Sequence, residues 1–224
     1  MTTFMLKMIA IITMLIDHSA AIFVPNNLPM YWVLRGIGRL AFPIFAFLLV
    51  EGFFHTRDVK KYLIRLGLFA FISEIPFDLA FYKTFFYPGH QNIFFTLFLG
   101  LLLMMILKKA EERFKKKTII SNILDAVITV GFCIIAVLLA TDYNYSGILL
   151  IISFYLFRGN KILLTLSLLI VTGYLMGPFS AIATLSMIFI WFYNGKKGRD
   201  AKYLFYIFYP AHLLILFFIS KFVL

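Results

Sequence analysis

The sequence predicts an all-α membrane protein, built as a bundle of about nine transmembrane helices. First, 62% of its residues are hydrophobic and 14% are charged, and its mean hydropathy is +0.96. A soluble domain is about half apolar and about a quarter charged. Second, apolar runs long enough to cross a bilayer recur up to the C-terminus. Third, the Lys and Arg residues gather in the short stretches between those runs.

Hydropathy and the polar residues between the runs place the individual helices. Pro25 and Pro29 follow the first run, a charged run beginning at Lys108 follows the fourth, and the Gly177-Pro178 pair precedes the eighth. The predicted spans are residues 4–24, 33–54, 62–82, 92–107, 119–140, 146–157, 162–176, 178–193 and 203–223. No internal repeat or soluble domain interrupts them, so we expect one integral membrane domain over residues 1–224.

The basic residues predict the orientation of these spans. With the N-terminus in the cytoplasm, 17 of the 21 Lys and Arg residues fall on the cytoplasmic side, and Arg35, Arg39, Lys83 and Lys221 remain outside. Cytoplasmic loops of membrane proteins carry such an excess. The net charge of +11 therefore indicates topology and contact with the lipid bilayer, and we expect no nucleic-acid partner.

Ionisable side chains inside the predicted spans are the strongest pointer to chemistry. Asp17 and His18 are adjacent in the first span, where a charged group costs at least about 2.5–3.5 kcal/mol. Arg35 and Arg39 follow in the second span, four residues apart and so on one helix face. In a catalytic interpretation, His18 is a general base whose ring Asp17 orients and balances in charge. Alternatively, Asp17 faces Arg35 or Arg39 and leaves His18 free for substrate. In a structural interpretation, Asp17 pairs with Arg39 and His18 bonds a carbonyl.

Further polar groups lie in the outer halves of other spans, or near the middle in the case of His212. His212 follows Tyr209 by three residues, so both lie on one helix face. Asn92 opens the fourth span from outside, where it could orient a substrate, and Glu74 lies in the third span near Pro76, where support of a kink is an equal alternative. These groups could converge on one pocket with His18. The sequence has no Walker or GxSxG motif. It also lacks a metal-ligand pair such as HExxH, so we expect no metal centre, although His18, His212 and Asp17 could in principle ligate one.

Several motifs together resemble a known family. They are Asp17-His18, the run RGIGRLAFPIFAF from Arg35, the run EGFFHTR from Glu51, the run NIFFTL from Asn92, and YPAH ending at His212. Along nearly the whole chain, these motifs resemble the TraX family of bacterial inner-membrane proteins, whose named member acetylates the N-terminus of a pilin. The resemblance implies a multi-pass acetyltransferase, distantly similar to membrane acyltransferases that use cytoplasmic acetyl-CoA and a histidine of the first span.

The residues and the resemblance lead to one expected function: transfer of an acetyl group from cytoplasmic acetyl-CoA to an amine, or less readily a hydroxyl, at the outer face. The acceptor would be a peptide, an amino sugar or another amine, and a homo-oligomer is left open. We expect His18 and Asp17 to be catalytic. The expected substrate-binding residues are Arg39, Arg35, Asn92, His212, Tyr209 and Glu74. The basic residues expected to bind the CoA phosphates are Arg57, Lys60, Lys61, Arg158 and Lys161.

A transporter is the alternative function. A small-molecule or proton-coupled transporter would use the same buried Asp, His and Arg groups, and helices broken at Pro43, Pro76 and Pro210 would suit it. The lack of a visible inverted repeat counts against this alternative.

Overall fold

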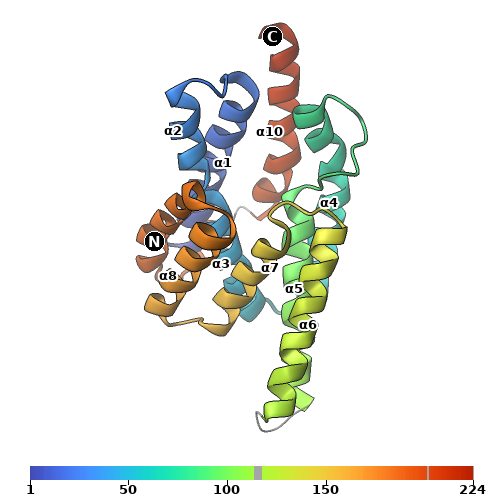
Figure 1. The fold of residues 1–224 in the computed structure, drawn as a ribbon, viewed down its shortest axis with the longest axis vertical. Helices are drawn as coiled ribbons and strands as arrows, with labels where there is room; N and C mark the ends of the chain where they lie inside the picture. Colours follow the sequence, from blue (N-terminus) through green and yellow to red (C-terminus); the bar gives the residue numbers. More distant parts are fainter. Residues whose placement is uncertain (114–117, 201, 224) are drawn as a thin grey trace.

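A computed structural model describes residues 1–113, 118–200 and 202–223 of the chain (Figure 1). Within those ranges the ordered elements are helices, together with one isolated bridge between Gln91 and Thr141. The prediction of an all-α fold is therefore confirmed. Lys115, Lys116 and Lys117, which contributed to the charge asymmetry above, lie outside the described residues.

Each of the nine predicted segments is helical, although three of them are divided. The first four correspond to α1 (Thr3–Phe23), α2 (Pro29–Gly38) with α3 (Ala41–His55), α4 (Val59–Tyr82) and α5 (Ile93–Arg113). The next two are α6 (Ile119–Leu138) and α7 (Asn144–Leu156). The last three are α8 (Lys161–Leu169) with the π-helix η1 (Ile170–Leu175), the 3₁₀-helix η2 (Pro178–Leu185) with α9 (Ser186–Trp191), and α10 (Lys202–Val223).

Length and composition support a membrane location for this bundle. Among the described residues, five helical stretches are long and apolar enough to span a bilayer: Thr3–Phe23, Pro29–His55, Ile93–Arg113, Ile119–Leu138 and Tyr203–Phe222. On α6, Ile119, Val127 and Leu138 expose 79, 62 and 78% of their surfaces. An apolar face of this kind is costly in water and favourable against lipid tails.

The helix breaks do not fall at the prolines that the transporter hypothesis used. The second predicted span is divided at Arg39-Leu40, before Pro43, which lies in the first turn of α3, where the missing N–H of proline is tolerated. The helices α4 and α10 continue through Pro76 and Pro210.

Backbone and side-chain contacts define the two ends of the bundle. At one end, the N–H of Thr3 donates to the carbonyl of Lys196 (2.9 Å), and Lys161 Nζ donates to the carbonyl of Trp191 (2.8 Å). This end comprises residues 1–3, 56–58, 157–160 and 192–200 and is termed the basic end. At the opposite end, the N–H of Gln91 donates to the carbonyl of Ala140 (2.9 Å), which joins the α4–α5 and α6–α7 connections.

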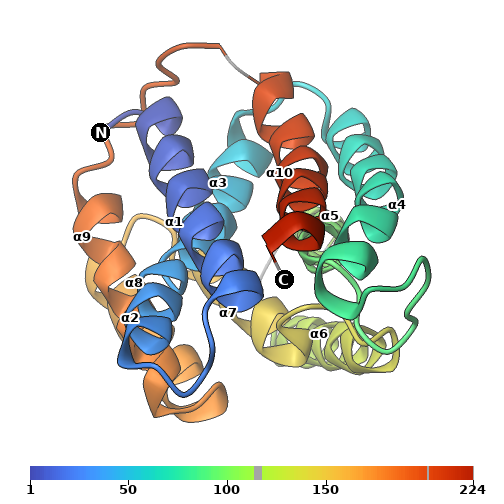
Figure 2. The ribbon, with the colours of Figure 1, turned by 90° about the horizontal axis from the view of Figure 1, so that it is seen from above.

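The last helix, α10, packs between α1 and α4. The view from above shows α10 beside both α1 and α4 (Figure 2), and it packs against both. Its buried face includes Tyr209 and His212, which are 3 and 4% exposed. The last helix of the chain is thus brought against the first.

Candidate functional site

The central feature is a pair of histidines contributed by α1 and α10. Nδ1 of His18 lies 2.8 Å from Nε2 of His212, and Nδ1 of His212 lies 2.8 Å from the carbonyl oxygen of Phe208. The ring planes differ by 12° and the ring centres are 5.1 Å apart. Two rings that are this close to parallel can have nitrogens 2.8 Å apart and centres 5.1 Å apart only if they meet edge to edge. The two imidazoles are therefore nearly coplanar, as a linear hydrogen bond requires.

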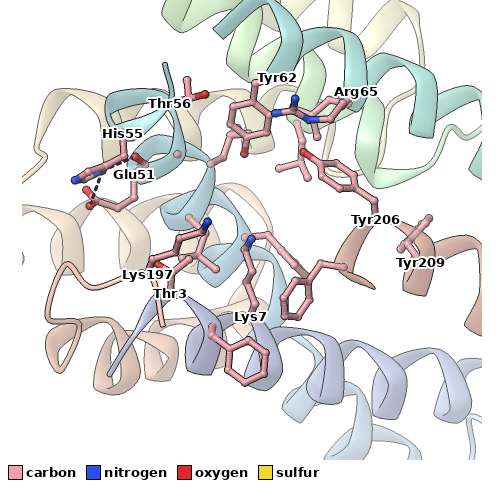
Figure 3. Close-up of a pocket in the computed structure, with 18 of the residues that line it drawn as sticks. Thr3, Lys7, Glu51, His55, Thr56, Tyr62, Arg65, Lys197, Tyr206 and Tyr209 are labelled. Atoms are coloured by element: carbon pink, nitrogen blue, oxygen red, sulfur yellow. Dashed lines mark hydrogen bonds and ion pairs between the residues drawn. The ribbon is translucent and has the colours of Figure 1, made fainter. Parts of the chain in front are cut away.

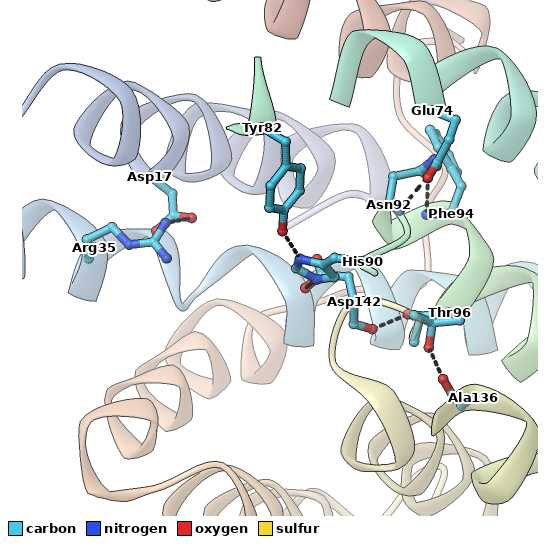
Figure 4. Close-up of polar contacts among 11 residues, drawn as sticks. Asp17, Arg35, Glu74, Tyr82, His90, Asn92, Phe94, Thr96, Ala136 and Asp142 are labelled. Atoms are coloured by element: carbon cyan, nitrogen blue, oxygen red, sulfur yellow. Dashed lines mark hydrogen bonds and ion pairs between the residues drawn. The ribbon is translucent and has the colours of Figure 1, made fainter. Parts of the chain in front are cut away.

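Asp17 bonds Arg35 and not the His18 ring. Oδ2 of Asp17 accepts from the Nη1 of Arg35 at 2.6 Å (Figure 4). Within the described part of the chain, Oδ1 of Asp17 and Nε of Arg39 are buried without a hydrogen-bond partner. The guanidinium of Arg39 lies over the ring of Phe179, 6.0 Å from its centre. The structural interpretation expected an Asp17–Arg39 pair and a carbonyl partner for His18, whereas Asp17 pairs with Arg35 and His18 takes its partner from α10.

Gly38 allows α2 to approach α1 closely enough for that ion pair. A Cβ atom at position 38 would overlap the carboxyl group of Asp17, whereas a Cβ at Gly36 would meet Ile182 at an ordinary 3.4 Å. We expect Gly38→Ala to lower the free energy of unfolding by about 1–3 kcal/mol, the usual cost of overpacking. Gly36→Ala is the matched control, since it makes the same change on the same helix. Thermal unfolding in detergent measures both, and equal stability of the two variants would contradict this account.

A second polar network lies at the end of the bundle opposite the basic end (Figure 4). Nδ1 of His90 is 2.6 Å from the hydroxyl of Tyr82, and its Nε2 is 3.4 Å from Oδ1 of Asp142. The hydroxyl of Thr96 donates to the backbone carbonyl of Asp142. The pKa of His90 is raised, chiefly by its hydrogen bond to Asp142, while burial opposes the shift. The network joins the loop before α5 to the loop before α7.

The raised pKa of His90 predicts a pH dependence of stability. Because folding favours the charged ring, the stabilisation is complete below the unfolded pKa of about 6.5 and is lost as the pH rises through the higher folded value. We expect the melting temperature of the wild type to exceed that of His90→Gln at about pH 5.5, and the gap to shrink by about pH 8.5. A gap that widens with pH would show that His90 is not held in its charged form.

Asn92 and Glu74 lie together, between α4 and α5. Asn92 is fully buried, and its side-chain amide donates to the carbonyl of Ala70 (2.8 Å) and to the carboxylate of Glu74. Its Oδ1 accepts from the N–H of Phe94 at 3.0 Å. These contacts hold the start of α5 against α4. The substrate-binding roles expected for the two residues stay predictions.

A cavity of about 430 Å³ opens at the basic end, between α1, α3, α4 and α10. Its rim carries the basic side chains Lys7, Arg65, Lys197 and Arg199. Figure 3 shows Lys7 and Lys197 on one side and Arg65 across from them. These residues come from α1, α4 and the α9–α10 connection, which the backbone bonds at residues 3 and 4 hold against α1. The lining also includes Glu51 and Asp200, and Lys197 pairs with Asp200 at 2.7 Å. Basic side chains still outnumber acidic ones, so the mouth carries an excess of positive charge.

The inner wall of this cavity adjoins the histidine pair. Tyr209 and Met14 line the wall. The ring centre of Tyr209 is 6.1 Å from that of His18 and 5.6 Å from that of His212. Met14 lies one helical turn before His18, on the same face of α1. His18 does not line the cavity itself, and it lies directly behind this wall.

The basic residues predicted to bind CoA lie at the same end of the bundle but not in this cavity. Arg158 donates from Nε to Oε1 of Glu51 (2.7 Å) and lies over the ring of Phe54. Lys61 pairs with Asp58 at 3.4 Å, Lys161 bonds the carbonyl of Trp191, and Arg57 and Lys60 are exposed. Their assignment to CoA stays a prediction. Sequence reasoning missed the rim because its residues come from separate segments, two of them inside or beside spans.

The fold and these groups define an all-helical membrane protein with a paired-histidine site between its first and last helices. The chain belongs to the TraX family, because the family model described as TraX protein matches residues 3–220. This confirms the resemblance inferred from the motifs. The chain is also similar to the probable fimbrial assembly protein FimC, serogroup H1, of Dichelobacter nodosus. The two are 34% identical over 241 residues, which cover 96% of this chain and 94% of that protein. No solved structure matches the chain.

Proposed function

We propose that this protein transfers an acetyl group from acetyl-CoA to an amine on the other side of the bacterial inner membrane. The cavity is the observation that carries the proposal, because it leads from a basic mouth to Tyr209, whose ring lies against His18. Membership of the TraX family, which is associated with pilin acetylation, supports the same activity.

The cavity suits a thioester donor with an anionic head. Its volume of about 430 Å³ falls within the usual range of small-molecule sites, about 300–1,000 Å³. Lys7, Arg65, Lys197 and Arg199 at the mouth would pair with the CoA phosphates, since bonds between charged groups are the strong ones. Phe94 and Leu97 line the cavity with Tyr209 and suit the less polar arm that carries the acetyl group.

His18 would act as the general base. It takes a proton from the acceptor amine as the nitrogen attacks the thioester carbonyl, so that a C–N bond forms and the C–S bond breaks. The proton on His18 then passes to the departing thiolate. The Nε–H of Arg39, buried without a partner among the described residues, is a candidate donor to the oxyanion. Because the wall formed by Tyr209 and Met14 separates His18 from the cavity, that wall must move aside, or the acetyl group must be relayed through the imidazole.

The proposed topology has nine crossings with the N-terminus in the cytoplasm. It places the basic end on the side where acetyl-CoA is made and follows the asymmetry of Lys and Arg. The relative from Dichelobacter nodosus carries a name that refers to fimbrial assembly. An amine on an exported fimbrial subunit is therefore the first acceptor to test, and an amino sugar is the second.

Thermal unfolding of the purified protein with and without CoA tests the donor. We expect stabilisation by CoA and acetyl-CoA, and loss of one acetyl group from an envelope peptide or glycan in a deletion strain. Unchanged stability, together with uptake into proteoliposomes that requires an ion gradient, would favour the transporter instead.

A further inference from the structure

We propose that His212 is a positioning residue that holds His18 in the tautomer whose Nε2 is unprotonated and basic. This inference rests on the proposed function only for its catalytic meaning. The hydrogen-bond chain itself runs from His18 through His212 to the backbone of α10, and it can be measured without any substrate.

The tautomers follow from the acceptor at the end of the chain. The carbonyl oxygen of Phe208 can only accept a hydrogen bond, so Nδ1 of His212 carries a proton. A neutral imidazole has one N–H, which leaves Nε2 of His212 as an acceptor. Nδ1 of His18, 2.8 Å away, must then donate to it. The lone pair of His18 is therefore on Nε2, which faces away from His212.

The surroundings favour the neutral form of His212. Its side chain is 4% exposed, and its hydrogen-bond partners are the His18 ring and a carbonyl oxygen. The nearby carboxylate of Asp17 is bonded to Arg35. A charged imidazole here would lie in the low-dielectric interior without a counter-charge of its own, which is costly.

The pair then works without a carboxylate. When Nε2 of His18 takes a proton from the acceptor, the Nδ1–H of the resulting imidazolium stays bonded to Nε2 of His212, which stabilises the new charge. In hydrolase triads a carboxylate holds the histidine tautomer in this way. The sequence hypothesis gave that role to Asp17, whereas the geometry gives it to a residue 194 positions away.

Nitrogen NMR of the full-length protein with ¹⁵N-labelled histidine tests the inference. The chain has four histidines, so His18→Gln and His212→Phe assign the signals of the pair. We expect protonated Nδ1 and unprotonated Nε2 on His18 in the wild type. We expect His212→Phe to abolish this preference. His212→Gln should retain it, because its amide oxygen can still accept the bond from His18.

Acetyl transfer provides the second measurement. We expect His212→Phe to lower the rate by about 100-fold or more and His212→Gln to recover most of it, with CoA binding unchanged in both. A wild-type His18 that carries its proton on Nε2, or one whose tautomer is the same in His212→Phe, would overturn the inference. The proposed function fails separately, if no variant and no wild-type sample transfers acetyl groups while the tautomer is as inferred.

Discussion

Replacing His18 with glutamine is expected to lower the rate of acetyl transfer by about 10²–10⁴-fold, the usual contribution of a positioned general base. The amide of glutamine can still donate to His212, but it cannot take up a proton at neutral pH. Binding of CoA should be unchanged, because His18 lies behind the cavity wall and not in its lining. The measurement is transfer from labelled acetyl-CoA in proteoliposomes, at saturating donor.

His90→Gln is the matched control for this variant. It makes the same replacement in the loop before α5, where His90 bonds Tyr82 and Asp142 and not the histidine pair. We expect it to retain the wild-type rate at a temperature where both proteins are folded. If His18→Gln and His90→Gln are equally active, His18 is not the base, and the catalytic assignment fails.

Neutralising the cavity rim is expected to weaken CoA binding strongly. Arg65→Gln should raise the dissociation constant for CoA by about tenfold or more, because a hydrogen bond to a charged group contributes about 1.5–3 kcal/mol. Lys197→Gln should have a smaller effect, because Lys197 is exposed and already pairs with Asp200 at 2.7 Å. The two side chains lie on different sides of the cavity, so the double variant should lose more than either single variant (Figure 3). Calorimetric titration measures both, and the loss should be largest at low salt.

Lys60→Gln and Lys61→Gln are the controls for the rim. Both lysines lie at the same end, on the first turn of α4, outside the cavity. We expect their replacement to leave CoA affinity within about twofold of the wild type, since exposed charges contribute little. If these variants lose affinity and the rim variants do not, the donor binds outside the cavity, as the sequence alone had suggested.

Local signals in the sequence were enough to predict the helices. A helix is stabilised by neighbouring residues and by its apolar surface, so the ends of α5 and α10 were predicted to within a few residues, apart from the longer charged end of α5. The divisions were harder to predict. The break at Arg39-Leu40 has no proline or glycine inside it, and it directly follows Gly38, which packs against Asp17 of another helix.

The sequence predicted which polar residues belong to the candidate site but not how they pair. Asp17, His18, Arg35 and His212 stood out because ionisable groups at membrane depth are costly and seldom kept without a use. Their pairing did not follow from spacing. Asp17 and His18 are neighbours in the chain but point about 100° apart on a helix, so each took a partner from a different helix.

The amino-acid sequence by itself determined the membrane class, the nine helical segments, the family and the polar residues worth testing, because hydropathy, charge and motif are properties of short stretches. Only the tertiary structure decided that His212 is the partner of His18 and that Lys7, Arg65, Lys197 and Arg199 share one cavity. Those contacts depend on α10 packing against α1 and α4, and packing between distant segments is set by the shapes of whole helices and not by local pattern.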